Sequence, residues 1–149
     1  MPPLVRRYLK TAIGFLLLGL ALGINMLAQR ELRGAWPTPW WISAHTHAIL
    51  VGFVMMMILG VALWMFPRPA KEDTQFSPLL AEVAYWFLTL GTAGRVLGEL
   101  LRPGNASLAL RWVVVAGGTA QAVGLAIFFW TMWTRIRGRP MTGASHENP

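Results

Sequence analysis

Five polar side chains that lie in otherwise apolar stretches are the residues of this sequence suited to hold a cofactor or a metal ion. They are Asn25, His45, His47, Arg95 and Glu99. A neutral imidazole is a common ligand of iron, copper and zinc, and a guanidinium holds a carboxylate through charge-assisted hydrogen bonds. The chain has no cysteine, which excludes disulfides and thiolate metal sites. No residue is predicted to be catalytic.

The two histidines are two positions apart, and this spacing limits what they can bind together. On a helix it corresponds to about 200° of rotation, so the rings leave on nearly opposite faces. His45 and His47 therefore cannot be the two trans ligands of one iron. They can serve two different sites, or one can be a ligand and the other structural. The alternative is that both are interfacial histidines, half solvated and bonded to loop carbonyls.

Arg95 and Glu99 are four positions apart and share one helix face. An ion pair between them would offset the cost of an ionisable group inside a membrane segment. Arg95 can instead extend toward lipid headgroups, or pair with the carboxylate of a bound ligand. Glu82 lies at the other end of the same apolar run, and Gln121 near the middle of the next one.

The elements that carry these residues are predicted to be membrane helices. The chain is 55% hydrophobic and 13% charged, whereas a soluble domain carries about 25% charged residues. Each apolar run has on the order of 20 residues, the length that crosses a hydrocarbon core. The sequence predicts an all-α bundle of four transmembrane helices in one domain (1–137) with a disordered cytoplasmic tail (138–149). The four helices are expected at about 8–28, 43–66, 78–101 and 108–133, the first being retained rather than cleaved as a signal peptide.

The basic residues flank the apolar runs, which favours a membrane topology over nucleic-acid binding. The net charge is +7. With both termini on the cytoplasmic side, eight basic residues face the cytoplasm and four face outward. The inner set is Arg6, Arg7, Lys10, Arg68, Lys71, Arg135, Arg137 and Arg139, and the outer set is Arg30, Arg33, Arg102 and Arg111. Tryptophans fall near the expected boundaries, at 36, 40 and 41 outside and at 64, 130 and 133 inside.

This topology brings the five candidate residues to similar depth. The second helix enters from outside and the third returns there, so all five lie in the outer half of the membrane, whereas Glu82 lies at the cytoplasmic end. Glycines in the apolar runs are expected to let helices approach closely. These are Gly14, Gly19, Gly23, Gly52, Gly60, Gly117, Gly118 and Gly124.

The second run resembles one helix of a known family. The residues that carry the resemblance are Ala44-His45-Thr46-His47, Gly52-Phe53, Gly60 and Trp64-Met65-Phe66-Pro67-Arg68. They look like the histidine-x-histidine helix in the catalytic subunit of heme-copper oxidases and nitric oxide reductases. The match covers about 25 residues, and the chain looks still more like short four-helix proteins grouped with that subunit. The resemblance implies the cytoplasmic (inner) membrane of a prokaryote.

In that family the first histidine of the pair binds the active-site heme and the second binds the low-spin heme, which the resemblance carries over to His45 and His47. The full subunit has about twelve helices and four further histidines. Here the remaining histidine is His146, in the polar tail. The chain is therefore not expected to be a complete oxidase or nitric oxide reductase on its own. A second axial ligand would come from another subunit or from a methionine such as Met26.

These observations lead to one functional hypothesis and two alternatives. The hypothesis is a heme-b-binding membrane protein acting in electron transfer or diatomic-gas (O2 or NO) handling, as a homo-oligomer, with respiratory-complex subunits or an electron donor as partners. Arg95 would lie beside a heme propionate. The first alternative is a cofactor-free accessory or assembly subunit of a respiratory complex. The second is a quinone-interacting protein that uses His47 or Glu99.

Overall fold

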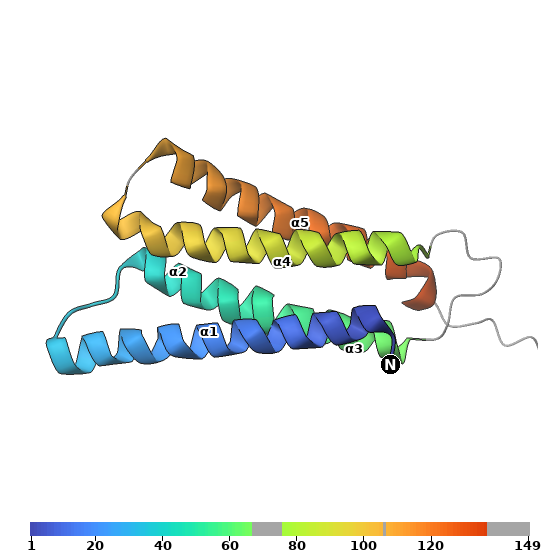
Figure 1. Cartoon of the computed structure of the whole chain (residues 1–149), viewed down its shortest axis with the longest axis horizontal. Helices are drawn as coiled ribbons and strands as arrows, with labels where there is room; N and C mark the ends of the chain where they lie inside the picture. The colour runs from blue at the N-terminus through green and yellow to red at the C-terminus, as the bar shows by residue number, and fades with distance from the viewer. Residues whose placement is uncertain (67–75, 106, 137–149) are drawn as a thin grey trace, which may run out of the picture.

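The computed structural model describes residues 1–66, 76–105 and 107–136, and these form four helices and no strand (Figure 1). The first helix is α1 (Pro3–Arg33). The second is continuous but changes its winding, from α2 (Pro39–His47) through η1 (Ala48–Met55) to α3 (Met56–Met65). The third is α4 (Pro78–Leu101), which ends in the short turn η2 (Arg102–Gly104), and the fourth is α5 (Leu108–Ile136). The predicted all-α architecture of four helices is confirmed.

Proline and small polar residues set where the helices begin. Proline occupies the first turn of α1, α2 and α4, where its missing N–H costs no helical bond. The side chains of Thr38 and Ser77 cap α2 and α4 by accepting bonds from the backbone N–H groups of Trp41 and Leu80. Gly34 ends α1 in the left-handed conformation, at φ 62°. The observed α1 is longer than predicted because it continues into polar residues at both ends. The predicted tail lies outside the described residues.

The segment η1 is a π-helix, a winding that the sequence analysis did not predict. Wide turns of this kind are rare and are often found at functional sites. The segment begins directly after His47, and its Gly52 lies against the ring of Phe15 in α1. The change of winding therefore separates the part of the helix that carries the histidines from the part that packs in the core.

Three helices are long and apolar enough to cross a membrane, namely Pro3–Arg33, Pro39–Met65 and Leu108–Ile136. The fourth, α4, is of similar length but carries Glu82, Arg95 and Glu99, and it packs against all three others. Many large apolar side chains on the other helices are exposed, as the lipid-facing surface of a bundle requires. The N-in, C-in orientation remains a prediction.

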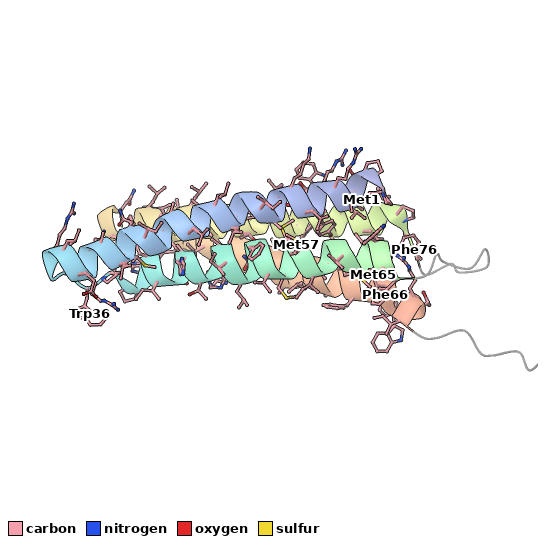
Figure 2. All side chains as sticks on the ribbon, turned by 90° about the horizontal axis from the view of Figure 1, so that it is seen from below. Met1, Trp36, Met57, Met65, Phe66 and Phe76 are labelled. Carbon is pink, nitrogen blue, oxygen red and sulfur yellow. The ribbon has the colours of Figure 1, made fainter. Side chains whose placement is uncertain are left out.

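The four helices lie closer together at one end of the bundle than at the other (Figure 1). We call these ends the Met1 end and the Trp36 end, after residues labelled in Figure 2. The main core gathers residues of all four helices toward the Met1 end, among them Tyr8, Met56, Leu88 and Phe128. A smaller cluster at the Trp36 end has no residue of α5, and consists of Leu22, Ala44, Ala48 and Val96. The less packed end carries the histidines.

Glycines bring the helices together as predicted, except at one position. The backbones of α4 and α5 touch where Gly91 crosses Gly117, because a Cβ on either would lie within 2.8 Å of the carbonyl oxygen of the other. Gly19, Gly23, Gly52, Gly60, Gly118 and Gly124 also lie against neighbouring helices. Gly14 was wrongly predicted to do so, since a Cβ there would meet no atom within 4 Å. It points away from the bundle.

We expect Gly91→Ala to destabilise the protein by about 1–3 kcal/mol, because the added methyl group meets a backbone oxygen that cannot move aside. Gly94→Ala is the matched control in the same helix. Its Cβ has nothing within 4 Å, so this change should be neutral or stabilising by up to about 1 kcal/mol. The free energy of unfolding in mixed detergent micelles measures both. Equal effects at the two positions would contradict the close crossing of α4 and α5.

Candidate functional site

His45 points from α2 toward α1 and has one of its ring nitrogens committed. Nδ1 lies 2.8 Å from the carbonyl oxygen of Gly19. Because a carbonyl only accepts, Nδ1 carries the proton and Nε2 keeps its lone pair. Gly23 makes room for the ring, since a Cβ at this position would lie 3.0 Å from Cε1 of His45. The imidazole therefore lies against α1 at Gly19 and Gly23, where no side chain stands in its way.

His47 points the other way, toward α4, and has the same proton arrangement. Its Nδ1 donates to the carbonyl oxygen of Ser43 at 2.8 Å, which leaves Nε2 without the proton. The same Nδ1 lies 3.9 Å from Oε2 of Glu99. The prediction that the two rings leave opposite faces of the helix is confirmed, since one faces α1 and the other faces α4.

Glu99 is the centre of a polar cluster that joins α2 to α4, which we call the Glu99 cluster (Ser43, His47, Arg95 and Glu99). Its side chain is 2% exposed. Oε1 accepts a bond from Oγ of Ser43 at 2.8 Å and one from Nε of Arg95 at 3.1 Å. Oε2 is buried and has no hydrogen-bond partner among the described residues. Of the three roles open to Arg95, the ion pair with Glu99 is the one observed.

Arg95 also contacts α5, where a glycine accommodates it. A Cβ at Gly118 would lie 2.9 Å from Nη1 of Arg95. The guanidinium therefore lies across a gap in the side chains of α5 while its Nε holds Glu99. The side chain is 27% exposed, so its outer part is not enclosed by the bundle.

A cavity of about 280 Å³ lies beside His45 at the Trp36 end, and we call it the His45 cavity. One wall belongs to α1 and the other to the start of α2. The connection between these helices supplies the remaining residues. The lining consists of Gly23, Met26, Leu27, Arg30, Trp36, Pro37, Ile42 and His45. Arg30 pairs with the adjacent Glu31, and its guanidinium lies 5.9 Å from the centre of the Trp36 ring.

The remaining polar residues are placed elsewhere. Asn25 is exposed on α1 and accepts a bond from Gln29, so it joins neither the Glu99 cluster nor the His45 cavity. Glu82 pairs with Arg7 at the Met1 end, as its predicted separation from the others requires. Gln121 is buried and donates to Thr92. The sequence analysis did not single out Arg30 or Trp36 as site residues, although Gly23, Met26 and Arg30 follow helical spacing on one face of α1.

The described residues do not form a metal site from protein ligands alone. No group of three or more His, Asp, Glu or Cys side chains converges within the described ranges. A porphyrin supplies four of the ligands of its iron and needs one or two side chains from the protein. Each imidazole, with Nε2 free, could supply one such side chain.

Comparisons with protein families, with curated proteins and with solved structures found no match to this chain. The resemblance to the histidine-x-histidine helix of heme-copper oxidases therefore stays an expectation from the sequence.

We expect Arg95→Met to destabilise the protein by about 2–3 kcal/mol, because it leaves the buried Glu99 carboxylate without its cation. Breaking a fully buried pair costs about 3–5 kcal/mol, and the partial exposure of Arg95 lowers that figure. The double variant Arg95→Met, Glu99→Gln should recover part of the loss, since no charge then remains buried. Unfolding in detergent measures the coupling between the two positions. Strictly additive losses would show that the two side chains do not interact.

Proposed function

We propose that this chain is a heme-b-binding, multi-pass protein of a prokaryotic cytoplasmic membrane that acts in electron transfer or diatomic-gas handling. One observation carries the proposal: Nδ1 of each of the two membrane histidines lies 2.8 Å from a backbone carbonyl oxygen. A neutral ring that donates Nδ1–H in this way keeps the lone pair of Nε2 free. Ligand histidines are held in this way in metalloproteins, where the bond fixes both the tautomer and the ring orientation.

The groups that accept these bonds favour histidines that bind iron over histidines that only lie at the membrane interface. Interfacial histidines were expected to bond to loop carbonyls and to be half solvated. The acceptors lie instead within helices, at Gly19 of α1 and Ser43 of α2. Both rings are partly buried. The two imidazoles are thus oriented by rigid backbone rather than by solvent or loops.

The surroundings of each ring suit an acidic cofactor. Arg30 lines the His45 cavity, and Arg95 lies in the Glu99 cluster with His47. A heme carries two propionates, which a guanidinium can hold by charge-assisted bonds. His45 would bind the iron and Arg30 would hold a propionate at the same site. His47 with Arg95 forms the second candidate site. When bound, the heme supplies the iron that exchanges electrons or takes up a gas.

The available volume sets how such a cofactor would be held. Ligand pockets span about 300–1,000 Å³, and the His45 cavity, at about 280 Å³, is slightly smaller than that range. A space of this size would enclose only part of a porphyrin, and the rest would lie against lipid or against a second copy of the chain. This partial enclosure agrees with the proposed homo-oligomer. The cofactor-free accessory subunit is the competing proposal, and in it the Glu99 cluster is purely structural.

Absorbance spectra of the protein purified in detergent, oxidised, reduced and with carbon monoxide, test the proposal. We expect a Soret band with heme present, either as purified or after heme addition. His45→Ala should weaken this band by the share that the His45 site contributes, because the change removes the ligand of that site. Thr46→Ala is the matched control, since this exposed side chain bonds only to the carbonyl of Ile42 among the described contacts, and it should leave the spectrum unchanged.

His47→Ala reports on the second candidate site, because its heme would be lost independently of the first. A wild-type protein that takes up no heme would overturn the proposal in favour of the accessory subunit. Heme retained unchanged in both histidine variants would refute the assignment of the ligands.

A further inference from the structure

We infer that one face of α1 binds an acidic phospholipid, whose headgroup lies at two cations near the Met1 end and whose acyl chain follows the helix. We call it the Lys10 face, and it consists of Arg6, Lys10, Ile13, Gly14, Leu17 and Leu20. The face points away from the other helices, so the inference does not depend on the proposed heme. What carries it is a pair of cations without ion-pair partners, placed above exposed apolar side chains on the same face.

The Lys10 face follows helical spacing on the side of α1 that does not pack in the bundle. Its residues recur at intervals of three and four, which keeps them on one face of a helix. The apolar side chains among them are strongly exposed, at 48% for Ile13, 64% for Leu17 and 49% for Leu20. The side chains that α1 buries, such as Tyr8 and Ala12, lie on the opposite side.

The two cations of the face are free to bind an anion. Arg6 and Lys10 are exposed and have no ion-pair partner among the described residues, whereas Arg7 between them pairs with Glu82. The first turn of α1 contains no acidic residue, and the positive end of the helix dipole lies beside Arg6. Figure 2 shows nitrogen-bearing side chains that project from the Met1 end of α1 away from the other helices. A phosphate between the two cations would accept charge-assisted hydrogen bonds from both.

The apolar part of the face has the length of one leaflet of a bilayer. From Lys10 to Leu20 the helix rises about 15 Å at about 1.5 Å per residue, which is half of a hydrocarbon core of about 30 Å. Gly14 leaves a gap in this stretch, because a Cβ there would meet no atom within 4 Å. An acyl chain that starts at Lys10 can therefore lie against the backbone at Gly14, beside Leu17.

The charge of the face favours an acidic headgroup over a zwitterionic one. Phosphatidylcholine carries an ammonium that balances its phosphate, whereas phosphatidylglycerol keeps a net negative charge. Each Lys or Arg near a membrane surface strengthens the binding of acidic lipid by about fivefold. The two free cations therefore predict a preference for phosphatidylglycerol of about 25-fold.

Native mass spectrometry of the full chain tests the inference, with the protein released from micelles that contain equal amounts of phosphatidylglycerol and phosphatidylcholine with the same acyl chains. We expect wild type to retain one phosphatidylglycerol per chain. The double variant Arg6→Gln, Lys10→Gln should lose the preference. The double variant Arg33→Gln, Arg111→Gln is the matched control and should keep it. It removes the same charge from two exposed arginines that lie outside the Lys10 face and have no ion-pair partner among the described residues.

Gly14→Leu tests the path of the acyl chain, because the new side chain fills the gap without meeting another residue. We expect this variant to release phosphatidylglycerol at a lower collision energy than wild type while it keeps the preference for that lipid. An unchanged release energy would overturn the placement of the acyl chain. Circular dichroism of each variant establishes that the helices are intact.

Three results would overturn the inference as a whole. The first is equal retention of the two lipids by wild type. The second is an equal loss of preference in both double variants, since acidic lipid would then follow net charge alone. The third is a dimer that Gly14→Leu dissociates and that the loss of both cations leaves intact. This result would assign the Lys10 face to a second copy of the chain.

Discussion

The arrangement of the Trp36 end depends on one buried carboxylate. Glu99 is almost fully enclosed, and a charge in such a place is stable only when other groups hold it. Ser43 and Arg95 supply these bonds and join α2 to α4. Ser43 and His47 lie on the face of α2 that meets α4, so these contacts favour the observed rotation of the helix. That rotation directs His45 toward α1. The carboxylate on α4 thus contributes, through the rotation of α2, to where the His45 imidazole lies.

The two ends of the bundle differ in what holds them together. At the Met1 end, the aromatic and aliphatic side chains of all four helices form one core, and Tyr8 stacks edge-on with both Tyr85 and Phe128. At the Trp36 end, polar bonds replace much of that packing and a cavity is left open. This difference would suit the proposed cofactor site, because a bound cofactor needs space between helices whereas the core is stabilised by close packing.

The sequence predicted the features that depend on local spacing. The helix ranges follow from apolar length, the opposed histidines from helical rotation, and the Arg95–Glu99 pair from its four-residue separation. It missed features that arise from how helices meet. The π-helical winding of η1 has no local signal, and the His45 cavity forms only where α1 and α2 diverge. Asn25 shares the depth of the histidines but not their direction.

The wide winding of η1 has a consequence for how this helix can vary. Each residue added to or removed from a helix turns everything beyond it by about 100°. In an ordinary α-helix, a residue added or removed between the histidines and the core would turn the two groups relative to each other. If the histidines kept their direction, Met56 and Leu59 would leave the core. A stretch of looser turns between them can absorb one residue by tightening. The rotational phase of the histidines and that of the core residues can therefore diverge without the helix breaking.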